Sequence, residues 1–117
     1  MANSRRVAIA TVDDVPEGGA RVFEISDEFI ALCRVAGRFW AIEDRCTHDD
    51  GPLGDGLIAG YEIECPRHGA RFDVRDGAVC RQPAFGPLTI YDVTVENGFV
   101  FIDLPGRRAE SADGERG

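Results

Sequence analysis

The sequence predicts an all-β fold in a single domain. Its 117 residues suffice for one domain with a modest core, and 44% of them are hydrophobic, which favours a globular chain over a disordered one. Short apolar or alternating runs are separated by turn residues along most of the chain. No segment of ten or more residues carries a helical hydrophobic repeat. Together these observations indicate a β-sandwich.

Four short strands are expected in the first 43 residues. They are predicted at residues 7–11, 21–25, 29–35 and 38–42. The second of them alternates polar and apolar side chains, as a half-buried strand does. The turns that separate the strands are expected at Pro16 to Gly19, Ser26 to Glu28 and Ala36-Gly37.

The middle of the chain is expected to be irregular and then to return to strands. Residues 49–56 are too rich in Gly, Pro and Asp for regular structure. Further strands are predicted at residues 57–58, 61–64, 71–73 and around Val79. The last two of these would pair across an Asp76-Gly77 turn. Residues 82–87 contain two prolines, which central strands exclude, so a loop is predicted there.

A hairpin is expected near the end of the chain. Asn97-Gly98 is the strongest hairpin signal in the sequence, and predicted strands at 91–96 and 99–102 flank it. This hairpin is expected to close the main sheet. From Pro105 to Gly117 the residues are small and charged without an apolar pattern, so residues 105–117 are predicted to be a disordered tail. The folded domain would then span residues 1–104.

Two short Cys–His motifs stand out from this pattern. Cys46-Thr47-His48 and Cys65-Pro66-Arg67-His68 are separated by sixteen residues, 49–64, and contain the only two histidines of the chain. Two thiolates and two imidazoles are enough to hold one metal centre. Structural zinc accepts such a set, but its usual spacing groups Cys with Cys and His with His. Mixed pairs suit a centre of two inequivalent metals, one bound by sulfur and one by nitrogen. Without a metal, the alternative is ordinary buried cysteines and hydrogen-bonded histidines.

The two motifs closely resemble the ligand loops of the Rieske family. The likeness includes Cys65-Pro66 and the His68-Gly69 that follows, and it extends more loosely from about Val7 to Leu104. It implies one Rieske [2Fe–2S] cluster per chain, in which two His replace two Cys on one of the irons. The implied cluster and metal ligands are Cys46, His48, Cys65 and His68. The resemblance also implies a Rieske-type β-sandwich with a small inserted cluster-binding subdomain at about residues 45–70, covered by the proline-containing segment at 82–87.

The resemblance also bears on the reduction potential of the cluster. High-potential members of the family carry a Ser and a Tyr that donate hydrogen bonds near the cluster, and Ala70 and Phe72 occupy those positions here. They also carry a disulfide between the ligand loops, where this chain has Gly51 and Arg67. With fewer donors, the reduced and more negative cluster is less stabilised. A potential in the lower part of the Rieske range is therefore expected.

A small free-standing protein of this kind resembles the ferredoxin component of bacterial aromatic-ring-hydroxylating dioxygenase systems. The resemblance implies a soluble one-electron carrier that accepts electrons from an NAD(P)H-dependent flavin reductase and passes them to a terminal non-haem iron oxygenase. The chain itself is not expected to be an enzyme and has no predicted catalytic residue. A mononuclear iron site needs further histidines, and none remains once the cluster ligands are assigned.

The tip of the cluster-binding subdomain is the implied docking face for these partners. The electron exit would be formed by His48 and His68. An apolar rim is expected from Leu53, Phe85 and Pro87, whose alternative is packing within their own loops. Steering of the partner is assigned to Asp49 and Asp50, although solvated loop charges are the commoner case.

Three other functions remain open from the sequence. One is the small Rieske-like subunit of a nitrite reductase, although members of that group can lack ligands that are all present here. Another is a structural zinc-binding interaction module, which colour and iron content would distinguish from a cluster protein. The third is a redox-sensing regulator, for which the sequence offers no DNA-binding helix.

The composition limits the partners and the compartment. The chain has 21 acidic residues against 13 basic ones, all of them Arg, and a formal net charge of −8. This charge disfavours nucleic acid and anionic membranes and favours a partner with a basic patch. No stretch is long enough to cross a bilayer, and no apolar signal region follows Ser4-Arg5-Arg6. A cytoplasmic monomer is expected, with Cys33 buried, Cys80 more exposed and a disulfide between them left open.

Overall fold

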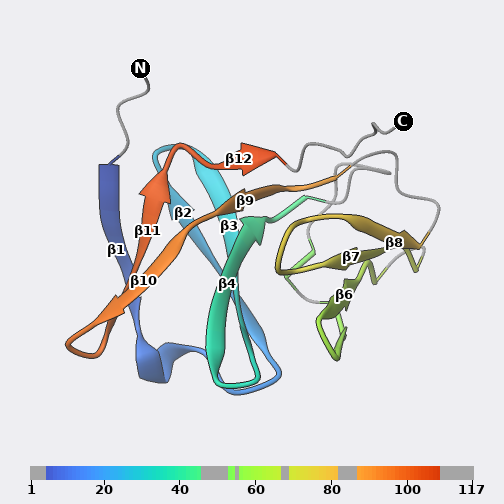
Figure 1. Ribbon diagram of the computed structural model, residues 1–117, viewed down its shortest axis with the longest axis horizontal. Helices are drawn as coiled ribbons and strands as arrows, with labels where there is room; N and C mark the ends of the chain where they lie inside the picture. Colours follow the sequence, from blue (N-terminus) through green and yellow to red (C-terminus); the bar gives the residue numbers. More distant parts are fainter. Residues whose placement is uncertain (1–4, 46–52, 55, 67–68, 82–86, 109–117) are drawn as a thin grey trace.

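The structure, a computed structural model, describes residues 5–45, 53–54, 56–66, 69–81 and 87–108. Within these residues the chain forms strands and one short 3-10 helix but no α-helix, which confirms the all-β prediction. The same residues contain no helix that could span a membrane. The strands form three antiparallel sheets (Figure 1).

The three sheets hold three, five and four strands. The first has the order β1-β11-β10, with bounds Arg5–Thr11, Phe99–Leu104 and Val93–Glu96. The second has the order β12-β9-β4-β3-β2, with bounds Arg107–Arg108, Thr89–Tyr91, Arg38–Glu43, Glu28–Val35 and Ala20–Ile25. The third has the order β5-β6-β7-β8, with bounds Ile58–Ala59, Glu62–Glu64, Arg71–Asp73 and Val79–Arg81. The 3-10 helix η1 (Val12–Asp14) follows β1. All strands predicted up to Val79 are present, with ends shifted by at most two residues.

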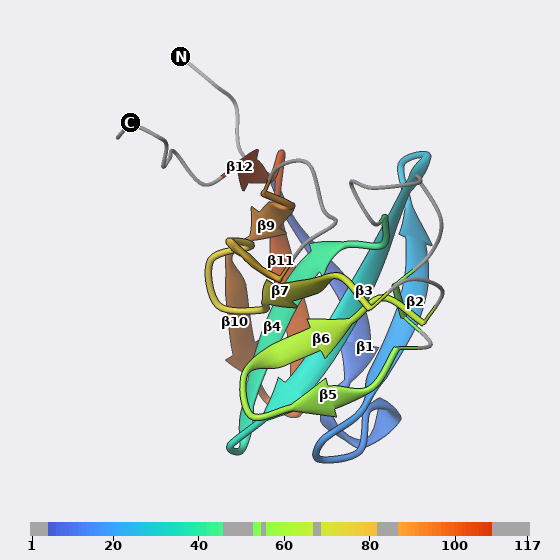
Figure 2. The same cartoon turned by 90° about the vertical axis from the view of Figure 1, so that its right-hand side faces the viewer.

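The five-stranded sheet is the middle layer of the molecule. Figure 1 shows the three-stranded sheet on one side of it and the four-stranded sheet on the other, and Figure 2 shows the four-stranded sheet in front of β3 and β4. Strand β3 is buried on both faces: Ala31 and Cys33 pack toward the four-stranded sheet, whereas Ile30 and Leu32 pack toward the three-stranded sheet. This double burial explains why its sequence is a continuous apolar run rather than an alternation.

The single strand expected at residues 91–96 is wrong, because the chain changes sheets at Asp92. Tyr91 belongs to β9 and pairs with β4 in the five-stranded sheet. Val93 belongs to β10 and pairs with β11 in the three-stranded sheet. One short stretch of chain therefore connects the two layers and contributes to both.

The Asn97-Gly98 hairpin is confirmed. Its two central residues have φ values of 52° and 81°, as a type I′ turn requires. The expectation that this hairpin closes the main sheet is wrong, because β10 and β11 lie in the three-stranded sheet with β1. A similar turn at Ala36-Gly37, with φ values of 56° and 75°, joins β3 to β4.

The predicted start of the disordered tail, at Pro105, lies too early in the sequence. After Gly106, strand β12 adds to β9, with Arg107 opposite Ile90. A Cβ on Gly106 would lie 2.7 Å from the carbonyl oxygen of Ile90, so glycine lets the chain pass closely here. Residues 109–117 lie outside the described residues.

The chain between β4 and β9 is an insertion into the five-stranded sheet, because these two strands are hydrogen-bonded neighbours. The insertion carries the four-stranded sheet, whose last strand, β8, ends at Arg81. The subdomain predicted at about residues 45–70 therefore stops before this sheet is complete.

Candidate cluster site

Only one of the four predicted ligands, Cys65, lies among the described residues. Outside them lie Cys46, His48 and His68, together with Asp49, Asp50, Gly51, Arg67 and Phe85. The described residues show how each predicted ligand loop leaves the fold and rejoins it.

Cys65 lies directly after β6, at the start of the second ligand loop. Its main-chain NH donates to the carbonyl of Ala70 at 2.7 Å, and its carbonyl accepts from the NH of Gly69 at 3.0 Å. Gly69 has a φ of 81°, a conformation that favours glycine. The Cys65 residue is 1% exposed and packs in the core between the four-stranded and five-stranded sheets. The two ends of the second loop are thus tied together beside a buried sulfur.

Asp44 ties the far end of the first ligand loop to the five-stranded sheet. Its NH donates to the carbonyl of Phe29 in β3 at 2.9 Å. Its carboxylate oxygen Oδ1 accepts from the NH groups of Leu53 and Gly54, at 2.7 and 2.6 Å. Hydrogen bonds to an ionised carboxylate are stronger than those between neutral groups. Residues 44 and 53 are therefore held close together across the first loop.

The return of the first loop rests against the start of the second. Glu64, the residue before Cys65, donates its NH to the carbonyl of Leu57 at 2.9 Å. A Cβ on Gly56 would overlap the carbonyl oxygen of Glu64, so this close approach requires glycine. The two predicted ligand loops thus meet at one place, which is what a metal centre shared between them needs.

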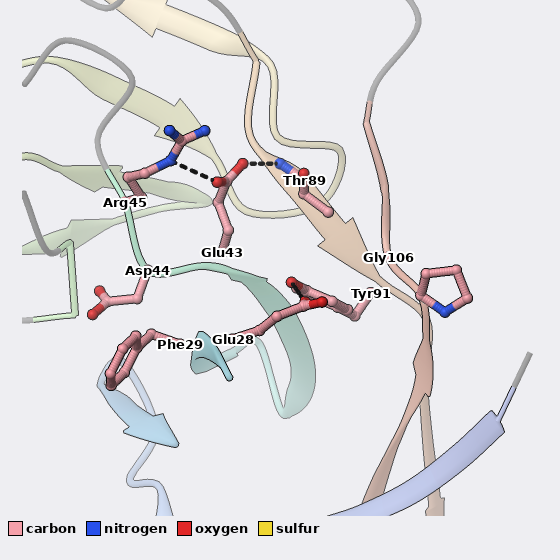
Figure 3. Close-up of a pocket in the computed structure, with 9 residues that line it drawn as sticks. Glu28, Phe29, Glu43, Asp44, Arg45, Thr89, Tyr91 and Gly106 are labelled. Atoms are coloured by element: carbon pink, nitrogen blue, oxygen red, sulfur yellow. Dashed lines mark hydrogen bonds and ion pairs between the residues drawn. The ribbon is translucent and has the colours of Figure 1, made fainter. Parts of the chain in front are cut away.

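Glu43, at the end of β4, connects the start of the first loop to β9 (Figure 3). Its Oε1 accepts from the NH of Thr89 at 2.5 Å, and its Oε2 accepts from Nε of Arg45 at 2.9 Å. Thr89 begins β9, two residues after Pro87, and Arg45 immediately precedes Cys46. The Glu43 side chain is 14% exposed, so water screens these interactions less than it would at the surface.

Glu43 also lines a pocket of about 420 Å³, together with Glu28 and Tyr91 (Figure 3). The hydroxyl of Tyr91 donates to Oε1 of Glu28 at 2.6 Å. Burial and this neighbouring carboxylate raise the pKa of Tyr91 above its ordinary value. Tyr91 therefore stays a neutral hydrogen-bond donor at physiological pH.

A buried Cys65, next to the place where the ends of the two loops meet, fits a [2Fe–2S] cluster held between them. Ala70 and Phe72 are fully buried in the same core as Cys65, and neither carries a hydroxyl that could donate to a cluster. No group of three or more His, Cys, Asp and Glu side chains that could hold a metal occurs within the described part of the chain. No described cluster of side chains therefore competes with the predicted site.

Two of the predicted rim residues are described, and one of them is misassigned. Leu53 is fully buried in the core with Cys65, so its predicted place in an exposed apolar rim is wrong. Asp44 fixes the NH of Leu53 at the point where the loop rejoins the fold, and the side chain of Leu53 packs into the core. Pro87 is half-buried, and Phe85 lies outside the described residues.

Cys33 and Cys80 are both free thiols, so the disulfide that the sequence left open is absent. Burial, together with the negative charge of Asp44, raises the pKa of the Cys33 thiol to about 12. Partial burial and the nearby Glu62 raise the pKa of the Cys80 thiol to about 11. Both thiols are therefore protonated and weakly reactive at neutral pH.

The roles of Glu43 and Asp44 were not predicted from the sequence. A usable signal was present, because two consecutive carboxylates stand four residues before the Gly-rich stretch at 49–56. The main-chain NH groups of such a loop need acceptors, and carboxylates are strong ones.

Residues 5–92 match the family model for the Rieske [2Fe-2S] domain. The chain is also 44% identical over 101 residues to the 3-phenylpropionate/cinnamic acid dioxygenase ferredoxin subunit of Escherichia coli, an alignment that covers 86% of this chain and 94% of that protein.

Solved structures give the same result. The ferredoxin of carbazole 1,9a-dioxygenase from Nocardioides aromaticivorans has a TM-score of 0.79 and 32% identity, over 83% of this chain and 95% of that chain. A chain from a complex of reduced oxygenase and oxidized ferredoxin in carbazole 1,9a-dioxygenase has a TM-score of 0.77 and 33% identity, over 83% of this chain and 91% of that chain.

Proposed function

The chain belongs to the Rieske [2Fe–2S] domain family, and from this we infer that one Rieske cluster is bound by its two Cys–His motifs, through Cys46, His48, Cys65 and His68. The observation that carries the ligand assignment is the meeting of the two loops, where the NH of Glu64 bonds to the returning first loop and the next residue, Cys65, is buried. The family match favours this cluster over the zinc site that the spacing alone left open.

When bound, the cluster supplies reversible one-electron transfer. The protein holds the ligand loops by main-chain hydrogen bonds and excludes water on the side of Cys65, where Leu53, Ala70 and Phe72 are fully buried. No side chain has to act as an acid, a base or a nucleophile, since an electron carrier makes and breaks no bond in a substrate. The protein is therefore an electron carrier and not an enzyme.

The proposed electron donor is an NAD(P)H-dependent flavin reductase, and the proposed acceptor is a terminal non-haem iron oxygenase. The similarity to a dioxygenase ferredoxin subunit and to a ferredoxin seen in complex with its oxygenase supports this place in a chain of carriers. A reducing cytoplasm is the proposed compartment, supported by the free thiols of the described cysteines. A monomer is the proposed state of this small carrier.

The proposed potential is low for a Rieske protein. Ala70 and Phe72 are fully buried with Cys65 but offer no hydroxyl donor. Hydrogen bonds to cluster sulfur stabilise the reduced form, which carries the additional negative charge. Their absence places the expected midpoint in the lower part of the family range, which runs from about −150 to +300 mV.

The ligand assignment is tested by electron paramagnetic resonance of the dithionite-reduced protein, with iron and sulfide assayed on the same sample. The expected result is two irons and two sulfides per chain and a signal whose average g value lies below that of all-cysteine clusters. Such a signal should disappear in the Cys65→Ser and His68→Ala variants. A zinc-containing, colourless sample would overturn the proposal.

The place in the electron-transfer chain is tested separately, with purified partners. Addition of the reductase and NAD(P)H should reduce the cluster, and subsequent addition of the terminal oxygenase with its substrate and oxygen should reoxidise it. A protein with a normal Rieske signal that neither partner can reduce or oxidise would keep the cluster assignment and refute the proposed role.

A further inference from the structure

We infer that Glu43 and Asp44 form an acidic clasp, a pair of positioning residues that sets the geometry of the first ligand loop. The inference rests on the proposed ligand set, because Cys46 and His48 belong to that loop. Neither carboxylate is assigned to the cluster itself. Each one instead holds groups at the points where the loop begins and ends.

The clasp is anchored to the rigid middle layer of the molecule. Glu43 is the last residue of β4, and the NH of Asp44 continues the ladder by donating to the carbonyl of Phe29 in β3. Successive side chains of a strand point to opposite sides. Figure 3 shows this at the end of β4, where the carboxylate of Glu43 lies between Arg45 and Thr89 and that of Asp44 points away from them.

Asp44 holds the end of the first loop. Its Oδ1 accepts hydrogen bonds from the NH groups of Leu53 and Gly54, and both residues belong to the stretch where the loop rejoins the fold. Leu53 is fully buried, so the loss of this acceptor would leave a main-chain NH without its partner next to the core. A Cβ on Gly54 would overlap the side chain of Val22, so glycine lets this stretch lie close to the five-stranded sheet.

Glu43 holds the start of the same loop. Its bond to Arg45 fixes the residue next to Cys46, and its bond to the NH of Thr89 fixes the start of β9, beyond the proline-containing segment at 82–87. One carboxylate thus joins the two strands between which the whole insertion lies. Groups that orient metal ligands in this indirect way typically change metal affinity or activity by 10- to 100-fold when they are removed.

The clasp is tested on the holoprotein by comparing Glu43→Gln with Glu28→Gln. Both variants remove one negative charge from the same pocket, and the amide oxygen can still accept from Thr89 NH or from Tyr91, respectively. Only Glu43→Gln replaces the carboxylate that accepts from Nε of Arg45. We expect iron release to an excess of chelator to be about tenfold faster in Glu43→Gln, near the lower limit of what loss of a charge-assisted hydrogen bond produces. Iron release from Glu28→Gln should be about unchanged.

Two further readouts separate positioning from general stability. The g values of the reduced cluster should shift in Glu43→Gln and in Asp44→Ala. The thermal unfolding midpoint of Glu43→Gln should equal that of Glu28→Gln. The Arg45→Gln variant should also speed iron release, and the effect of the double variant should be smaller than the product of the two single effects.

The outcomes are distinguishable. If the wild-type protein lacks a Rieske signal, the proposed ligand set fails and the clasp fails with it. If the wild-type signal is present but Glu43→Gln and Glu28→Gln behave alike, only the clasp is wrong. Additive effects of Glu43→Gln and Arg45→Gln, or an equal fall in the unfolding midpoint, would likewise contradict the positioning role.

Discussion

The guanidinium of Arg75 lies over the ring of Tyr61, 4.0 Å from its centroid. The ring of Tyr61 in turn meets that of Trp40 edge to face, with centroids 6.1 Å apart, and Arg38 lies 5.2 Å above Trp40. Tyr61 lies in the turn between β5 and β6, whereas Trp40 belongs to β4. This stack of rings and cations therefore joins the inserted sheet to the middle layer.

The first prediction concerns this stack. Tyr61→Leu should lower the free energy of unfolding by about 1 kcal/mol, because it removes the aromatic pair with Trp40. Tyr61→Phe, which keeps the ring, should stay within about 0.5 kcal/mol of the wild type. Denaturant unfolding followed by Trp40 fluorescence measures both variants, and an equal loss in the two would assign the effect to the hydroxyl group instead.

The second prediction concerns the potential. Phe72→Tyr introduces a hydroxyl at a fully buried position in the core that contains Cys65. If it donates to the cluster or to a ligand sulfur, it should raise the midpoint by about 60 mV, which for one electron corresponds to about 1.4 kcal/mol. Phe99→Tyr, on the three-stranded sheet, adds the same hydroxyl at an exposed position and should leave the midpoint unchanged. Redox titration measures the midpoints of both variants, and equal midpoints would contradict a hydrogen bond from residue 72. A wild-type midpoint above about +100 mV would refute the low-potential assignment.

The third prediction concerns the contact between the ligand loops. Gly56→Ala should destabilise the protein by roughly 3 kcal/mol, because its Cβ would overlap the carbonyl oxygen of Glu64 and the two loops would have to move apart. Gly60→Ala is the control: its Cβ meets nothing within 4 Å, but its φ of 61° costs about 1 kcal/mol. Unfolding curves and iron content should both rank Gly56→Ala as the more severe change.

The fourth prediction concerns thiol chemistry as a function of pH. Alkylation requires the thiolate, and the raised pKa values keep both Cys33 and Cys80 protonated at neutral pH. The alkylation rate of Cys80 should rise about tenfold per pH unit and level off only near its pKa of about 11. Cys33 is fully buried and should react only after unfolding. The sites of modification are measured by mass spectrometry of holoprotein treated with iodoacetamide at pH 8 to 9. Modification of Cys33 before Cys80 would contradict the predicted order.

The fifth prediction concerns partner association. The net charge of −8 should attract a partner with a basic surface, so the second-order rate of reduction by the reductase should fall as ionic strength rises. The midpoint potential of the cluster, measured over the same range of salt, provides a control for effects of salt on the cluster itself. A rate of reductase-driven reduction that is independent of salt would exclude electrostatic steering.

The strands could be predicted from the sequence because each is marked by its own residues. Residues 21–25 alternate, Asn97 and Gly98 form the turn between β10 and β11, and Phe29 to Cys33 form an apolar run long enough for a doubly buried strand. The change of sheet at Asp92 could not be predicted, because Tyr91 to Glu96 alternates as one strand would. Strand β12 was missed for another reason: it is short and charged, and it is defined by its pairing with β9 rather than by its own pattern.

The candidate site shows the same division. The sequence could propose Cys65 and the three other ligands from residue types and spacing, because metal chemistry restricts both. Leu53 was misassigned because a leucine in a Gly-rich loop looks exposed until the bond from its NH to Asp44 is known. The bond between Glu43 and Thr89 joins residues 46 positions apart in the chain, a distance over which a local pattern carries no information.

The insertion leaves from β4 and returns at β9, two strands that pair directly through Ala41 with Tyr91 and Ile42 with Ile90. Its two ends are thus about one strand spacing, roughly 5 Å, apart. A module with adjacent ends can be lengthened, shortened or transplanted as a unit without rethreading the strands that carry it. In such an architecture, substitutions in the insertion can alter the electronic properties of a bound centre. The strands that carry the insertion can keep their own sequence.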